Sequence, residues 1–228
     1  MQYISERILI VKTDRKAILA ELKRLYPEAG PELDFAFARA KEAGAMVDMA
    51  ARGALPLRVT HNDTKLNNVM IDLDTDEGVC VIDLDTVMPG SILYDFGDSI
   101  RSGANPAAED EKDLGKVDFS LPLYEEYIRG FLSEACLTET ELENLAWGAR
   151  LMTYECGMRF LTDYLDGDLY YRTNRPGQNL DRARTQLKLL ADMEKLFGRM
   201  RDIAHKNTKG YNLRDAVFKE GGDSYLGT

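Results

Sequence analysis

The hydrophobic and polar positions divide the chain into a helical start, a short region of strands and a long helical end. Residues 6–26 carry apolar side chains at a helical period, although residues 8–11 could equally form a short strand. The alanine-rich residues 33–52 predict a second helix, which ends at the turn-forming residues 53–56. The start of the chain is therefore expected to be a helical segment.

The pattern then changes to short apolar runs separated by polar turns. Residues 57–60 predict a short strand, and residues 61–68 predict a polar loop. The apolar runs 69–73 and 79–82 flank a turn of acidic residues, threonine and glycine, which predicts a β-hairpin. The composition of the second run predicts a buried strand, and Asp83 follows it directly, at a strand end where functional side chains are commonly presented.

The rest of the chain predicts helices after a polar loop at residues 104–117. Residues 120–135 form the first predicted helix. A capping box of Thr138 and Glu141 opens another, whose apolar stripe continues to Phe160. Residues 179–206 predict a further helix. The tail after residue 206 is polar and glycine-rich, and we expect it to be loosely held. The sequence shows no internal repeat.

Composition and charge narrow the classes of partner. The 228 residues are 44% hydrophobic and 30% charged, which is ordinary for a soluble globular protein. The net charge of -10 argues against nucleic acid or an anionic membrane as the main partner. No signal pattern and no apolar run approaching the roughly 18 residues of a membrane span is visible, so we expect a cytoplasmic protein.

The cysteines and histidines argue against disulfides and zinc. Cys80, Cys136 and Cys156 form no CxxC pair and lie in apolar contexts, which predicts reduced, buried thiols. Only His61 and His205 are present, too few for an ordinary zinc site.

The residues with the clearest chemistry lie between the strands. The run 61–68 has the spacing HxDxxxxN, and Asp83 follows the hairpin twenty positions after Asp63. This layout is typical of protein-kinase-like phosphoryl transfer, which needs an oriented hydroxyl and neutralised phosphate charge. Asp63 is the predicted catalytic base. Asn68 and Asp83 are the predicted ligands of Mg²⁺, which prefers hard oxygen atoms. The alternative is a polar turn in which the Asp and Asn only cap backbone groups.

Beyond the motif, residues 60–85 and 89–98 resemble the aminoglycoside phosphotransferase and choline kinase superfamily. Within that superfamily, the amino-acid sequences of residues 61–68 and 159–168 are similar to those of the N-acetylhexosamine 1-kinases. The resemblance covers roughly residues 55–200 of the chain. It implies phosphorylation of a small sugar or amino-sugar hydroxyl by ATP with Mg²⁺.

The resemblance also implies roles for individual residues. It gives the base role to Asp63 and the magnesium roles to Asn68 and Asp83. Asp95 would brace the catalytic loop, and His61 would be structural and packed behind it.

A second set of residues is expected to face the acceptor. In the resembling family the corresponding region lies at the acceptor pocket. The set combines guanidinium, carboxylate and aromatic groups that suit sugar hydroxyls and ring faces: Arg159, Asp163, Tyr164 and Tyr170. The alternative is a solvated helix end with a core tyrosine.

The chain departs from the family pattern at its start. Kinases of this kind have an N-terminal lobe with a nucleotide-covering loop and a strand lysine, and only Lys12, after residues 8–11, superficially matches the lysine. We therefore expect the fold to be α+β and mostly α-helical: a protein-kinase-like C-terminal lobe with a catalytic β-hairpin and the N-lobe missing.

Three parts follow from this interpretation: an N-terminal helical segment at 1–54, a catalytic lobe at 55–206 and a tail at 207–228. With half of the ATP pocket absent, we expect substrate binding to outlast turnover. The uncovered surface should be apolar, which predicts self-association or use of residues 1–30 as a cover.

Two other functions remain open. Residues 83–87 also fit the DxDx[TV] signature of haloacid dehalogenase-like phosphatases, with Asp83 as the aspartyl nucleophile and Asp85 as general acid. That fold needs a parallel sheet with alternating strands and helices, which the helical C-terminal half does not predict. The second alternative is a lobe that binds a sugar or a partner chain without turnover.

Overall fold

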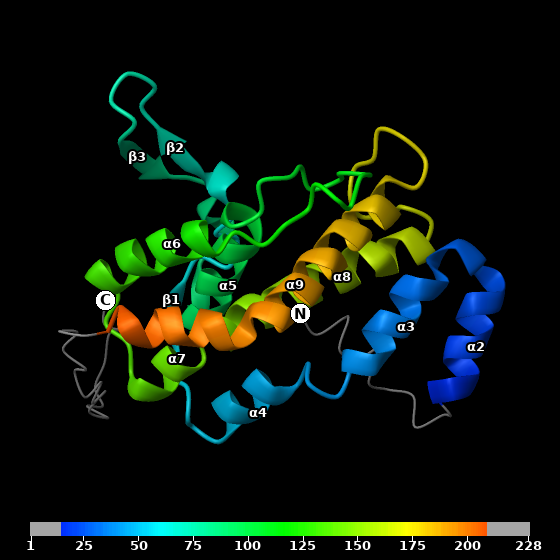
Figure 1. The fold of residues 1–228 in the computed structure, drawn as a ribbon, viewed down its shortest axis with the longest axis horizontal. Coiled ribbons are helices and arrows are strands. Elements are labelled where there is room, and N and C mark those ends of the chain that lie inside the picture. The colour runs from blue at the N-terminus through cyan, green and yellow to red at the C-terminus, as the bar shows by residue number, and fades with distance from the viewer. Residues whose placement is uncertain (1–14, 209–228) are drawn as a thin grey trace, which may run out of the picture.

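The computed structural model describes residues 15–208, and these form a mostly helical α+β fold with two small antiparallel sheets (Figure 1). Lys12, the ambiguous run 8–11 and the tail after residue 208 lie outside the described residues. The predicted fold class is confirmed at this level, whereas the division into three parts and the absence of an N-lobe stay predictions.

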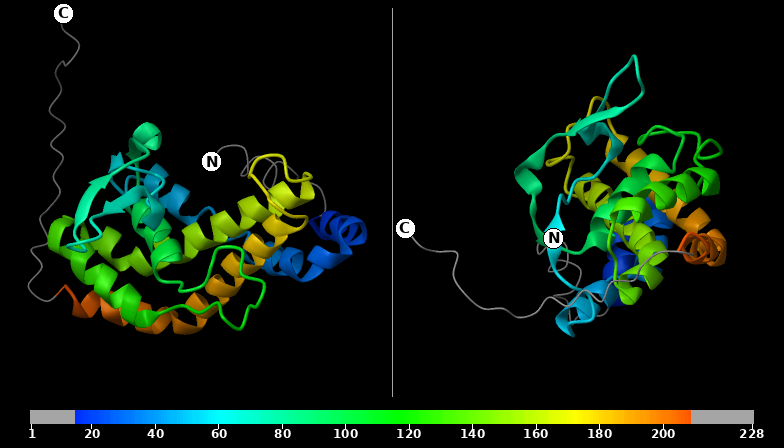
Figure 2. Two further views of the ribbon diagram at one scale, coloured as in Figure 1. Left: turned by 90° about the horizontal axis from the view of Figure 1, so that it is seen from above. Right: turned by 90° about the vertical axis from the view of Figure 1, so that its left-hand side faces the viewer.

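Two long helices form the centre of the molecule. Helix α8 (Leu145–Leu165) and helix α9 (Gln178–Lys206) lie side by side, and α5 (Ile92–Gly103) packs across α8 (Figures 1 and 2). Glycines permit this crossing. A Cβ on Gly97 would lie 2.4 Å from the carbonyl oxygen of Gly148, so α5 and α8 approach as closely as backbone atoms allow.

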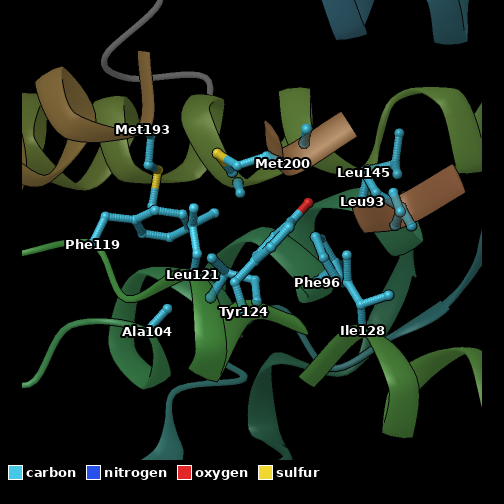
Figure 3. Close-up of a cluster of buried hydrophobic side chains, with 14 of the residues drawn as sticks. Leu93, Phe96, Ala104, Phe119, Leu121, Tyr124, Ile128, Leu145, Met193 and Met200 are labelled. Atoms are coloured by element: carbon cyan, nitrogen blue, oxygen red, sulfur yellow. The ribbon is translucent and has the colours of Figure 1, made fainter. Parts of the chain in front are cut away.

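The largest hydrophobic cluster is built between α5, α6 (Leu121–Glu134), α8 and α9. Phe96 meets Tyr124 edge to face, with ring centroids 6.2 Å apart. Figure 3 shows the side chains that point toward one another here, among them Leu93, Phe96, Tyr124, Ile128, Leu145, Met193 and Met200. Because α5 contributes directly to this core, the segment just before it is held by the most buried part of the protein.

The N-terminal helical elements are α2 (Arg15–Leu25), the short 3₁₀ turn η1 (Pro27–Ala29), α3 (Gly30–Arg39) and α4 (Ala45–Ala51). Among them, α3 packs against α8 and α9, and α2 packs against α3. The predicted single helix at residues 33–52 is wrong, since residues 40–44 form a turn between α3 and α4. After this turn Met46 of α4 packs in the main core, whereas Leu33 and Ala36 of α3 belong to a second buried cluster.

A second break separates α7 (Glu139–Glu143) from α8. The predicted capping box is confirmed, because Thr138 accepts from the Glu141 N–H while Glu141 accepts from the Thr138 N–H. The predicted continuous helix is wrong, since Asn144 leaves helical geometry and its side chain donates to the Thr140 carbonyl. Arg58 also holds the Glu141 carboxylate through two bonds of 2.6 Å, which anchors α7 to the first strand.

The strands form two separate pairs. Strand β1 (Arg58–Thr60) pairs antiparallel with β4 (Met88–Gly90), a partner that the sequence did not indicate. Strands β2 (Val69–Ile71) and β3 (Gly78–Val81) form the predicted hairpin, flanked by the 3₁₀ turns η2 (Leu66–Asn68) and η3 (Leu84–Thr86). A Cβ on Gly90 would lie 2.4 Å from Thr60 Oγ1, so the β1–β4 pair requires glycine there.

The prediction that residues 79–82 form a buried strand is wrong. Val79 is 63% exposed and Val81 is 51% exposed, because the two-stranded hairpin stands away from the helices and neither face is covered by a described element (Figures 1 and 2). Cys80 and Cys136 are likewise exposed, and only Cys156 is buried as expected. We call the exposed apolar side chains of this hairpin the hairpin surface; they are Val69, Met70, Ile71, Leu73, Val79, Val81 and Ile82.

Across residues 15–208, no helix combines the length and the apolar character that crossing a lipid bilayer requires.

Exposure of the hairpin surface predicts self-association of the chain. Contiguous exposed apolar patches are typical of interaction sites, and a two-stranded hairpin has free edges that pair with other strands. We expect light scattering to show a mass above the monomer that rises with concentration. Val79→Lys should shift the chain toward monomer, whereas Val47→Lys, at an exposed position on α4, should not. A monomer at every concentration would contradict this.

Candidate active site

The loop between β1 and β2 is held by the first turn of α5. Asp95 Oδ2 accepts from the His61 N–H at 2.8 Å, and Asp95 Oδ1 accepts from the Asn62 N–H at 2.8 Å. Thr64 Oγ1 donates to the Asp95 carbonyl oxygen. Burial raises the pKa of Asp95, and the two N–H bonds partly offset this. Asp95 thus lies where the sequence expects a brace for the loop.

His61 connects the loop to the end of β3. Its Nε2 lies 2.9 Å from the Ile82 carbonyl oxygen, and the Asp63 N–H donates to its Nδ1 at 3.3 Å. Because Nδ1 accepts, these contacts assign the ring proton to Nε2, which then donates to Ile82. The geometry agrees with the expected structural role, since both ring nitrogens are used within the protein.

A further pair of bonds joins the loop to the segment after Asp83. Asn62 adopts a left-handed backbone with φ of 64°, and its side-chain amide donates to the Thr86 carbonyl at 3.0 Å. Thr86 Oγ1 donates back to the His61 carbonyl at 2.6 Å. Asp83 is also left-handed, with φ of 64°. Left-handed backbone at non-glycine residues such as Asn62 and Asp83 is typical of sites where side-chain direction matters.

Asp63 lies in this loop with one oxygen bonded and one available. Its Oδ2 accepts from Lys65 Nζ at 2.6 Å and from Asn68 Nδ2 at 2.9 Å, while within residues 15–208 no donor bonds Oδ1. Burial tends to raise the pKa of Asp63, but the bonds from Lys65 and Asn68 outweigh it and the pKa is lowered. The carboxylate is therefore ionised near neutral pH and can accept a hydroxyl proton through Oδ1.

Lys65 is a candidate functional residue that the sequence reasoning missed. It lies inside the HxDxxxxN run, two positions after Asp63, and its partly exposed side chain forms an ion pair with the carboxylate. The spacing alone did not show whether Lys65 pointed to Asp63 or to solvent.

The residues predicted to hold Mg²⁺ are brought together by the backbone. The Ile82 N–H donates to the Asn68 carbonyl at 2.9 Å, which places Asp83 next to Asn68. Asn68 uses its amide nitrogen on Asp63, which leaves Oδ1 without a partner, and the exposed Asp83 carboxylate accepts no hydrogen bond within the described part of the chain. Both are hard oxygen donors and fit Mg²⁺.

These two ligands would not hold the ion alone. No group of three His, Cys, Asp or Glu side chains suited to a metal occurs in residues 15–208. Because Mg²⁺ usually completes its coordination with water and substrate phosphates, a two-ligand site is consistent with binding alongside a nucleotide.

Asp63 opens onto a cavity of about 770 Å³ whose wall includes residues of α8, α9 and the connection between them. Arg159 and Tyr170 line the same cavity, and the Arg159 guanidinium lies 5.7 Å from the Tyr170 ring centre and 5.4 Å from that of Tyr171. The structure therefore brings Asp63, Arg159 and Tyr170 to one hollow, although they are far apart in sequence.

Asp163 lies beneath this wall and holds the connection. Its carboxylate accepts from the N–H groups of Tyr170 at 2.7 Å and Tyr171 at 2.9 Å, and from Asn179 Nδ2 at 2.8 Å. Both oxygens are thus used within the protein. The position favours a positioning role for Asp163 over the direct contact with substrate that the sequence suggested.

Tyr164 faces away from the cavity. Its hydroxyl donates to Glu28, and its ring packs against Tyr26 with centroids 6.3 Å apart. It does not line the hollow beside Asp63, so its predicted acceptor contact gains no support from its position.

The phosphatase alternative has no support in the fold. Asp83 and Asp85 follow β3, which pairs antiparallel with β2 in a two-stranded sheet. All strand pairs of the described residues are antiparallel, so the parallel sheet that an aspartyl-nucleophile site requires is not formed there.

Comparison with family models gives one finding. The model of the phosphotransferase enzyme family, APH, matches residues 11–127. The match includes the catalytic loop, the hairpin, Asp83 and Asp95, and it ends within α6. Arg159 and Tyr170 lie outside it, so the match concerns the catalytic side of the cavity and not the side expected to face the acceptor.

Lys65→Met should move the acid limb of the pH–rate profile to higher pH. Asp63, the predicted base, can accept a proton only when ionised, and loss of the Lys65 ammonium removes one of the bonds that lower the pKa of Asp63. We expect activity to be lost first at acidic pH when kcat/KM is measured across the pH range. Lys41→Met, at an exposed position, is the control. An unchanged acid limb would show that Lys65 does not set the protonation of Asp63.

Proposed function

We propose that this chain, which belongs to the phosphotransferase enzyme family, transfers a phosphoryl group from ATP to a hydroxyl group of a small sugar or amino sugar. The observation that carries the proposal is the Asp63 carboxylate. It is kept ionised by Lys65 and Asn68, has one oxygen that no donor of residues 15–208 bonds, and faces a cavity large enough for such an acceptor. The family membership supports kinase-like phosphoryl transfer; the acceptor is our proposal.

In the proposed reaction, Asp63 Oδ1 accepts the proton of the acceptor hydroxyl as its oxygen attacks the terminal phosphorus of ATP. Asp95 accepts from the His61 N–H before Asp63 and from the Thr64 hydroxyl after it, so the carboxylate needs little reorganisation when the acceptor arrives. Asn68 and Asp83 would hold Mg²⁺, which when bound neutralises phosphate charge.

The acceptor would lie between the catalytic loop and the wall that carries Arg159 and Tyr170. The guanidinium offers hydrogen-bond donors in a fixed plane, and the aromatic ring offers an apolar face for a sugar ring. Asp163 acts indirectly in this proposal, because it holds the backbone of Tyr170 and Tyr171.

The nucleotide side is less complete within the described residues. None of the strands β1 to β4 carries a lysine that could bind ATP phosphates, and the hairpin surface beside Asp83 is uncovered. We therefore propose that acceptor binding outlasts turnover in this chain by itself. The chain is titrated with Mg²⁺-ATP in the presence of acceptor, and phosphorylated acceptor is measured. Only a kinase forms this product, so the experiment separates a weak kinase from a lobe that binds without turnover.

Asp63→Asn should lower kcat by about 10²- to 10⁴-fold with little change in KM. The amide keeps the shape of the side chain but cannot accept the hydroxyl proton. Both constants, kcat and KM, are measured from the transfer of labelled phosphate from ATP to a panel of hexoses and N-acetylhexosamines, in an assay sensitive enough to detect a single turnover. Asp74→Asn, in the exposed hairpin turn, should have no effect. Full activity in Asp63→Asn would exclude Asp63 as the base.

Asp83→Asn should weaken metal binding in the presence of ATP by at least about tenfold, because a charged oxygen ligand becomes a neutral one. Electron paramagnetic resonance of Mn²⁺, used in place of Mg²⁺, measures bound and free metal directly. The matched control is Asp85→Asn, two residues along the same exposed turn, which should bind the metal normally. Equal loss in both variants would contradict the specific role of Asp83.

A further inference from the structure

The cavity beside Asp63 has a positively charged lining within an acidic protein. The whole chain carries a net charge of -10, yet five cationic and only two anionic side chains line this cavity. The cations are Lys65, Arg101, Arg159, Arg172 and Arg182, and the carboxylates are those of Asp63 and Glu109. A cavity lined by an excess of one charge attracts ligands of the opposite charge.

Two of the five cations are held by carboxylates and are poorly accessible to a ligand. Arg101 lies 2.6 Å from Asp98, and Glu109 lies 3.6 Å from Arg101 and 3.7 Å from Arg182. The side chains of Arg101 and Arg182 are only 10% and 17% exposed. These two guanidinium groups are therefore compensated within the protein, and the excess of positive charge comes from other members of the lining.

Arg172 has no such compensation. It is exposed and forms no ion pair within residues 15–208. Its main chain is nevertheless held on both sides of the Arg172 Cα. The Arg172 carbonyl accepts from Arg182 Nη1 at 3.2 Å, and the N–H of the preceding residue, Tyr171, donates to Asp163 at 2.9 Å. The Arg172 guanidinium thus extends from an anchored backbone and is available to a ligand in the cavity.

Arg159 is a second cation that a ligand can reach. Its side chain is 38% exposed, and its guanidinium lies 5.4 Å from the ring centre of Tyr171, the neighbour of Arg172 in the chain. Glu155 approaches Arg159 Nε only to 3.9 Å, which is beyond hydrogen-bonding distance. A guanidinium with available N–H groups matches the two oxygens of a carboxylate or phosphate.

These two arginines lie on the proposed acceptor side of the site and not on the proposed metal side. Arg159 belongs to α8, and Arg172 lies in the connection between α8 and α9. Neither Asn68 nor Asp83, the proposed Mg²⁺ ligands, lines this cavity. An ATP whose phosphates lie at the metal would therefore leave the two arginines without an anion.

We infer that the acceptor carries an anionic group, a carboxylate or a phosphate, in addition to the hydroxyl that reaches Asp63, and that Arg159 and Arg172 bind this group. The inference rests on the proposed function and narrows its acceptor to acidic or phosphorylated sugars. A neutral acceptor forms no charge-assisted hydrogen bonds with the two guanidinium groups and leaves their charges uncompensated, so it binds less tightly.

The test compares two pairs of sugars that differ in the charge of one group. Glucuronate is paired with glucuronamide, in which a neutral amide replaces the carboxylate, and glucose 6-phosphate is paired with glucose. Transfer of labelled phosphate from ATP gives kcat/KM for each sugar, and calorimetry gives its dissociation constant. At least one anionic sugar should exceed its neutral partner in both by about 10- to 10²-fold. Added salt should reduce this preference, because salt screens charges that are partly exposed.

The pair that shows the preference tells whether the anion is a carboxylate or a phosphate. Arg159→Gln and Arg172→Gln should each reduce that preference by about tenfold through the KM for the acceptor, with the KM for ATP unchanged. Arg199→Gln removes the same charge from an exposed position of α9 that does not line the cavity, and should leave the preference unchanged. Each preference is a ratio within one variant, so partial loss of folded protein does not alter it.

The outcomes separate the two proposals. Transfer without a preference for either anionic sugar, or with a preference that both arginine variants keep, overturns the anionic acceptor and leaves the proposed function standing. A rise in the KM for ATP alone in the arginine variants assigns these residues to the nucleotide and also overturns the inference. Binding without transfer contradicts the proposed turnover, while the ratio of dissociation constants still decides whether the acceptor is anionic. Absence of both binding and transfer for all four sugars overturns both.

Discussion

The carboxylate of Asp95 is the point at which the helical core controls the candidate active site. It accepts hydrogen bonds from the N–H groups of His61 and Asn62, the two residues that precede Asp63. Asp95 is placed by α5, which is locked against α8 where Gly97 meets Gly148. The position of Asp63 therefore depends on a helix crossing that only glycine permits, and the packing of the core fixes the loop more firmly than its own short strands could.

The same arrangement explains how a strongly acidic protein can support chemistry on a phosphate. The chain carries a net charge of -10, yet Lys65 is paired with Asp63 and four arginines line the adjacent cavity. Five cationic side chains and only two carboxylates, those of Asp63 and Glu109, line this cavity, so its lining is positive although the whole chain is acidic. The proposed metal site at Asn68 and Asp83 adds only one carboxylate, because substrate phosphates would supply the remaining ligands.

The two sides of the site differ in how they are supported. The proposed acceptor side is built on α8 and α9, where Asp163, Asn179 and Gly157 fix the cavity wall through buried contacts. The proposed nucleotide side is a two-stranded hairpin whose apolar residues are exposed on both faces. An uncovered hairpin of this size contributes little stability by itself. Its exposed apolar residues are therefore typical of an interaction site, on which another surface packs.

Local sequence patterns determined much of the secondary structure of this protein. The hairpin of β2 and β3, the capping box of Thr138 and Glu141 and the mostly helical character follow from periodicity and turn chemistry, which act over a few residues. The adjacency of Asp63 and Asn68 follows in the same way, because both lie in one short loop.

Burial and long-range neighbours were decided by tertiary structure alone. Nothing local shows that β3 lacks a covering element, that Tyr164 turns toward Glu28, or that Lys65 reaches Asp63. The β1–β4 pair was missed for the same reason, since its strands are distant in the chain. Helix α5 was also missed, although Ser91 caps its start and is a local signal. Arg182 Nε and Gln186 Oε1 are buried and have no hydrogen-bond partner within residues 15–208. No local pattern predicts this, because whether a polar atom lacks a partner depends on everything that packs around it.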